Sequence, residues 1–62
     1  MFTFENAKIA RDEAARFLKR VEDYIKYVKT SVIYENEKTA KRLAVKRSAM
    51  DLREALRELN RQ

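Results

Sequence analysis

The chain contains neither glycine nor proline in its 62 residues. Glycine supplies the positive φ angles of many tight turns, and proline rigidifies loops and interrupts helices. Without either residue, the sequence predicts helix over nearly its whole length. Cysteine and histidine are also absent, so disulfides are excluded and the usual ligands of zinc and haem are missing.

Apolar residues recur with heptad spacing in one continuous register. With Ala7 as position a, the a and d positions of the first half hold Ala7, Ala10, Ala14, Phe17, Val21, Tyr24 and Val28. In the second half, the same positions hold Val45, Ala49, Leu52, Leu56 and Leu59. Leu18, Ile25 and Val32 lie beside them at position e and widen the core-facing stripe. Sustained spacing of this kind predicts that helices pack against each other.

Polar residues interrupt the stripe in the middle of the chain. Four successive d and a positions hold Ser31, Glu35, Lys38 and Arg42. A continuous coiled coil would bury three of these as charges, which is costly without partners. The largely β-branched run at residues 30–33 also forms helix weakly. We therefore predict a bend at about residues 31–36.

The expected fold is all-α: a helical hairpin of two long antiparallel helices, forming a single domain over residues 1–62. The first helix covers about residues 4–32, with Thr3 as its N-cap, and the second about residues 37–60. Asn36 and Ser31 are candidate N-caps of the second helix. One unbroken helix in an elongated coiled coil is the alternative architecture.

A domain of this size buries only about 60% of the surface that its unfolded chain exposes. Small scaffolds commonly gain stability from disulfides, a metal or oligomerisation. Because the first two are disfavoured here, we expect the hairpin to pair into a dimeric four-helix bundle or to dock on a partner.

The second helix carries a second set of apolar residues. Leu43 and Met50 are seven positions apart at position b, well away from the main stripe. Tyr27 and Tyr34 share the g edge of the chain. These four residues are the candidate partner-binding residues, because a helix with two apolar faces requires two neighbours. The preferred function is binding of another protein, or of a second copy, as an adaptor, an assembly subunit or an inhibitor of a larger machine.

A basic nucleic-acid-binding regulator or accessory factor is the alternative function. Residues 38–47 hold five basic side chains and no acid, and the chain has a formal net charge of +5. Cations can displace counterions from phosphates, and tyrosines such as Tyr27 and Tyr34 can stack on unpaired bases. The candidate nucleic-acid-binding residues are Lys38, Lys41, Arg42, Lys46, Arg47, Arg53 and Arg57.

The composition disfavours catalysis. General acid–base catalysis most often uses histidine, and phosphate-cradling loops need glycine. We expect no enzyme activity, no cofactor, no metal and no small-molecule substrate. We expect no membrane segment either, because the longest uncharged stretch is five residues and a spanning helix needs about 20. The lack of cysteine fits a cytoplasmic protein, and a virus- or plasmid-encoded protein acting in the host cytoplasm has the same signature.

Overall fold

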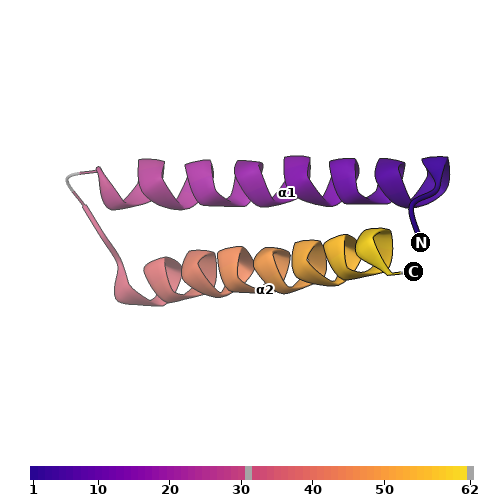
Figure 1. Ribbon diagram of the computed structural model, residues 1–62. Coiled ribbons are helices and arrows are strands. Elements are labelled where there is room, and N and C mark those ends of the chain that lie inside the picture. The colour runs from indigo at the N-terminus through magenta and orange to yellow at the C-terminus, as the bar shows by residue number, and fades with distance from the viewer. Residues whose placement is uncertain (31, 62) are drawn as a thin grey trace.

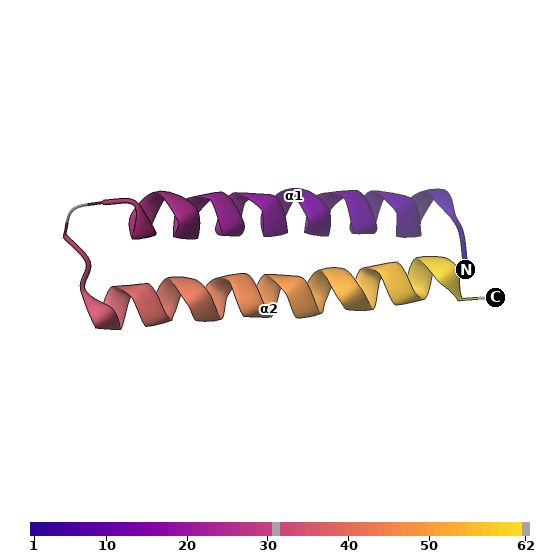
Figure 2. The same cartoon turned by 60° about the vertical axis from the view of Figure 1, so that its left-hand side comes forward.

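The computed structural model describes residues 1–30 and 32–61, which form two antiparallel helices lying side by side (Figures 1 and 2). Helix α1 runs over Phe4–Val28 and helix α2 over Glu35–Asn60. The molecule measures 47 × 14 × 11 Å, and both termini lie at the end opposite the bend (Figure 1). The all-α helical hairpin is confirmed, and the alternative of one unbroken helix is wrong.

Helix α1 begins as the sequence predicts. Thr3 is the N-cap, with φ −124° and ψ 163°, and its Oγ1 accepts a hydrogen bond from the Asn6 backbone N–H at 3.1 Å. Glu5 lies in the first turn, where a negative charge interacts favourably with the helix dipole. One threonine side chain therefore satisfies a backbone donor that the helix leaves free.

Helix α1 ends at Val28, before the expected end at about residue 32. The Lys29 N–H donates to the Ile25 carbonyl at 3.2 Å, and the Thr30 N–H donates to the Tyr27 carbonyl at 3.1 Å. The Thr30 hydroxyl also donates to the Tyr27 carbonyl, at 2.7 Å. The threonine side chain thus competes with helix continuation where the β-branched run begins.

Helix α2 begins at Glu35 with Tyr34 as its N-cap, and no side chain makes a capping hydrogen bond there. Asn36 therefore lies in the first turn and is not the N-cap, while Ser31 lies outside the described residues. The Tyr27 hydroxyl accepts a hydrogen bond from the Tyr34 N–H at 2.9 Å and donates to Glu37 Oε2 at 2.8 Å. A phenol on α1 thus anchors the start of α2, which local capping rules do not anticipate.

Small residues lie at the centre of the contact between the helices. Ala10 and Ala55 are 7% and 9% exposed, and Ser48 is 1% exposed. Ala10 is at position d of α1, whereas Ser48 and Ala55 are at position g of α2. Because these side chains are short, the helices meet closely but bury little apolar surface between them.

The widened stripe does not face α2 as expected. Leu18 and Ile25, at position e of α1, are 57% and 46% exposed, whereas Val32 lies beyond the end of α1 and is 57% exposed. Helix α1 presents its d and g positions to α2, as the half-buried Phe17 and Tyr27 show. Position e is consequently turned away from the contact.

Candidate partner-binding surface

One side of the hairpin carries apolar residues of both helices that the helix–helix contact leaves partly uncovered. Helix α1 contacts α2 through positions d and g, and α2 contacts α1 through position g. Antiparallel packing therefore turns positions a and e of α1 and positions a and d of α2 to a common side. We call this side the apolar face. It is formed by Ala7, Ala14, Leu18, Val21, Ile25 and Val28 of α1 and by Val45, Ala49, Leu52, Leu56 and Leu59 of α2.

The apolar face is accessible along the length of the hairpin. Its largest exposed side chains are Leu18 and Ile25 on α1 and Leu56 on α2. The residues between them, such as Val21 and Leu52, are half-buried. A surface of this kind, bounded by polar residues, typically marks a binding site for another macromolecule.

The opposite side, which we call the polar face, carries the polar contacts between the helices. Arg16 Nη2 lies 2.9 Å from Asp51 Oδ2, and Lys41 Nζ lies 2.8 Å from Asp23 Oδ2. The Tyr27–Glu37 hydrogen bond lies on the same side. These contacts are partly exposed to solvent, so each one fixes the helix alignment more than it adds stability.

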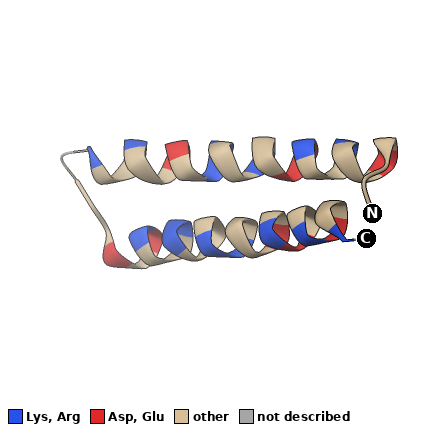
Figure 3. Ribbon diagram, viewed as in Figure 1, with Lys and Arg blue, Asp and Glu red and all other residues tan. Residues whose placement is uncertain are grey.

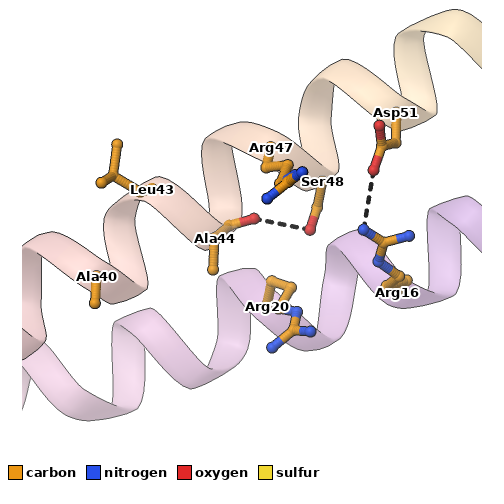
Figure 4. Close-up of a pocket in the computed structure, with 8 residues that line it drawn as sticks. All are labelled: Arg16, Arg20, Ala40, Leu43, Ala44, Arg47, Ser48 and Asp51. Carbon is orange, nitrogen blue, oxygen red and sulfur yellow. Dashed lines mark hydrogen bonds and ion pairs between the residues drawn. The ribbon is translucent and has the colours of Figure 1, made fainter.

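The polar face also contains a shallow, open hollow between the helices (Figure 4). Arg16 and Asp51 are paired across it, while the Ser48 hydroxyl donates to the Ala44 carbonyl at 2.8 Å. The residues around it are Arg16, Arg20, Ala40, Leu43, Ala44, Arg47, Ser48 and Asp51. Among the described residues, the side chains of the other two arginines around it, Arg20 and Arg47, make no hydrogen bond or ion pair, and the hollow is too open to enclose a small molecule.

Three of the four candidate partner-binding residues are accessible. Leu43 and Met50 are exposed on the outer edge of α2, and Leu43 points away from α1 in Figure 4. Tyr34 is also exposed, at the start of α2. The Leu43 and Met50 edge is separate from the apolar face, because Lys46 and the other residues at position e lie between them.

Tyr27 has a structural role at the bend. Its side chain is half-buried, and its hydroxyl is engaged by Tyr34 and Glu37. Desolvation raises the pKa of Tyr27, the backbone hydrogen bond to Tyr34 opposes that rise, and Glu37 reinforces it. Lys41 Nζ lies 5.3 Å from the centre of the ring. These contacts leave the ring little freedom to stack on a nucleic-acid base.

The candidate nucleic-acid-binding residues do not form one surface. Lys41 is half-buried and paired with Asp23, and Lys38 is half-buried. Arg47 lies on the polar face beside the hollow. Arg42, Lys46 and Arg53 are exposed on or beside the apolar face. Arg57 is exposed on the Leu43 and Met50 edge and pairs with Glu54 at 3.8 Å. Figure 3 shows basic residues along both helices, interrupted by acidic ones.

The Lys41–Asp23 contact perturbs both charges. The hydrogen bond from Lys41 holds the pKa of Asp23 below its ordinary value. The same hydrogen bond raises the pKa of Lys41. Both groups are therefore held in their charged forms, and Lys41 contributes to hairpin alignment.

Sequence reasoning placed Leu18, Ile25 and Leu56 in the helix–helix stripe and did not propose them as binding residues. The sequence feature that indicates these binding residues is the width of the apolar stripe, which spans positions a, d and e. One neighbouring helix covers a narrower band than that. A stripe of this width in a two-helix chain indicates that part of it meets something outside the chain.

Other classes of site are not apparent in residues 1–30 and 32–61. No group of three or more acidic side chains in this part of the chain is arranged to hold a metal ion. Neither described helix combines the length and apolar character needed to cross a membrane. No protein-family model, curated protein or solved structure matches this chain.

Proposed function

We propose that this chain is a non-catalytic helical binding protein that acts through protein–protein contacts, as an adaptor, an assembly subunit or an inhibitor of a larger machine. The observation that carries the proposal is the apolar face, where Leu18, Ile25 and Leu56 are exposed on the same side of the hairpin. A second copy of the chain and a different protein are both partners of this class.

The free energy of burying apolar side chains favours a partner that covers the apolar face. The hydrophobic residues buried within the hairpin are Ala10 and Ala55, which contribute little apolar area. Full burial of one leucine or isoleucine side chain contributes about 1.5–3 kcal/mol. A partner that covers Leu18, Ile25 and Leu56 therefore supplies burial that the hairpin does not provide by itself.

A double substitution on the apolar face tests this function. Leu18→Glu with Leu56→Glu places carboxylates on the face, while Ala40→Glu makes a similar change at an exposed position on the opposite side. The partner is first isolated with the wild-type chain from cells that express it, then purified and titrated against each variant. We expect the double variant to lose binding at least about tenfold, since two buried apolar contacts are removed, and Ala40→Glu to retain it.

Circular dichroism of each variant controls for folding. A double variant that keeps its helix content and also binds its purified partner with wild-type affinity would contradict the proposal. Sedimentation of the chain alone shows whether the partner is a second copy.

A second candidate function, nucleic-acid binding, is favoured by the acid-free segment at residues 38–47. Arg42, Lys46 and Arg47 in this segment are exposed. Titration with duplex DNA, single-stranded DNA and structured RNA at low and near-physiological salt tests it. Phosphate binding predicts a steep loss of affinity with salt and a further loss in Lys46→Glu/Arg47→Glu. Absence of binding at low salt would remove this candidate.

A further inference from the structure

The charges of the chain are distributed unequally between its two faces. Positions a, d and e, which include the apolar face, hold five basic residues and one carboxylate, that of Glu35. Positions c, f and g, which include the polar face, hold seven basic residues and eight carboxylates. The positive charge is thus concentrated on the side that exposes apolar residues. The five basic residues are Arg11, Lys38, Arg42, Lys46 and Arg53.

Four of these cations lie on α2 and one, Arg11, on α1. Arg11 lies on the α1 side, and Lys46 and Arg53 lie on the α2 side, with Arg42 nearer the bend. Among the described carboxylates, Arg11 pairs with its neighbour Asp12, at 3.0 Å. Within the described part of the chain, no carboxylate lies within 4.0 Å of Arg42, Lys46 or Arg53. These three residues form a basic border along the α2 side of the apolar face, whose positive charge the hairpin itself does not neutralise.

We propose that the apolar face binds an acidic amphipathic helix of another protein. This inference rests on the proposed function and names the chemistry of the partner. An apolar stripe on the incoming helix would lie over Leu18, Val21 and Leu52, in the helix-in-groove mode of recognition. Carboxylates on one flank of that stripe would meet Arg42, Lys46 and Arg53 along α2, and Arg11 lies at the α1 edge.

Charge complementarity favours this partner over a second copy. Two hairpins joined through their apolar faces would bring two basic borders together, and like charges in proximity oppose association. An acidic helix removes that repulsion and adds attraction. The two arrangements also respond to salt in opposite directions, because screening weakens attraction in one and repulsion in the other.

The full-length chain can be titrated with designed helical peptides. The acidic peptide has about three heptads with Leu at a and d and Glu at e and g, and is about 32 Å long as a helix. Two control peptides are used: a twin peptide with the same Leu positions and Lys at e and g, and a peptide with the acidic sequence scrambled. We expect the acidic peptide to bind roughly tenfold more tightly than its twin, because several border pairs each contribute modestly. We also expect added salt to weaken this binding.

Charge-reversal variants show where the peptide binds. Lys46→Glu/Arg53→Glu should remove the preference for the acidic peptide, whereas Lys19→Glu/Arg47→Glu, which makes the same change in charge on the other side, should preserve it. Leu18→Glu/Leu56→Glu should abolish binding of the acidic peptide. If both charge-reversal variants lose affinity for the acidic peptide equally, the cations beside the apolar face have no specific role in binding it.

The remaining outcomes separate this inference from the proposed function. If the acidic and Lys peptides bind equally and both lose binding to Leu18→Glu/Leu56→Glu, the apolar face binds helices without selecting acidic ones. That result would support the proposed function and overturn the inference of an acidic partner. If the acidic peptide does not bind, the acidic-helix inference is overturned, and the purified partner still tests the proposed function. A dimer that tightens with salt would identify a second copy as the occupant. If the chain binds vesicles containing phosphatidylglycerol, and the acidic peptide competes with that binding, the occupant is a lipid surface. Either the salt-strengthened dimer or the vesicle binding would overturn the inference.

Discussion

Ser48 shows how single residues set the distance between the helices. It is the most deeply buried residue of the hairpin, at 1% exposed, yet its hydroxyl donates to the carbonyl of Ala44 in its own helix. The side chain therefore needs no polar partner on α1. Its contribution to the contact is its small size, which it shares with Ala10 and Ala55.

Substitution of Ser48 tests the importance of side-chain volume. Ser48→Leu should destabilise the hairpin by about 1–3 kcal/mol, because a larger side chain does not fit without moving the helices. Ser48→Ala should be neutral or stabilising by about 0.5 kcal/mol, since it keeps the volume small and raises helix propensity. Urea denaturation followed by circular dichroism measures both changes. Equal destabilisation by Ala and Leu would instead assign the role to the hydroxyl.

The Lys41–Asp23 pair links hairpin stability to pH. The lowered pKa of Asp23 stabilises the folded state above about pH 4, and that contribution is lost as the pH falls through the folded-state pKa. The raised pKa of Lys41 stabilises the folded state below about pH 10, and that contribution is lost as the pH rises through its folded-state pKa. The pair therefore stabilises the folded state between about pH 4 and about pH 10. Salt screens this contribution because the pair is solvent-accessible.

Removal of the Lys41 charge should change the titration of Asp23. In Lys41→Met, we expect the pKa of the Asp23 carboxyl to rise toward its ordinary value, measured from its carbon chemical shift by NMR. Lys46→Met is the matched control, because Lys46 makes no ion pair with a described carboxylate. An Asp23 midpoint that does not move in Lys41→Met would show that the pair is not formed in solution.

At the scale of elements, the two helices begin by different means. A side-chain cap from Thr3 begins α1, whereas α2 begins at Tyr34 without one and depends on the Tyr27 hydroxyl from across the bend. The start of α1 is consequently a local property of its sequence. The start of α2 depends on the two helices already lying together.

The N-cap of α1 can be tested by a single substitution. Thr3→Ala should lower the free energy of unfolding by about 1 kcal/mol, because the Asn6 N–H loses its acceptor. Thr39→Ala, at an exposed position inside α2, is the control and should be neutral or slightly stabilising. Thermal unfolding and amide exchange at Asn6 measure the effect. Unchanged exchange at Asn6 in Thr3→Ala would argue against the cap.

At the scale of the whole molecule, the exposed leucine and isoleucine side chains and the net positive charge lie on the same side of the hairpin. The polar face contains the Arg16–Asp51 and Lys41–Asp23 pairs, which join the two helices. The apolar face leaves leucine, isoleucine and arginine side chains without equivalent partners in the described hairpin. A bound partner would therefore stabilise the fold, by about 2.7 kcal/mol when its free concentration is 100 times Kd.

The sequence by itself determined the helices, the hairpin and the Thr3 cap. These features follow from local rules: heptad spacing, the absence of glycine and proline, the β-branched run at residues 30–33, and a threonine at the helix start. The location of Leu43 and Met50 away from the main stripe also followed from helical periodicity alone.

Only the tertiary structure decided how α1 is rotated against α2. That rotation depends on which short side chains permit the closest approach, and Ala10, Ser48 and Ala55 occupy the contact. It turned Leu18 and Ile25 outward, placed Lys41 against Asp23, and brought the Tyr27 hydroxyl to the start of α2. Heptad spacing identifies an apolar stripe but leaves open which part of it the partner helix covers, because packing between side chains far apart in sequence fixes that choice.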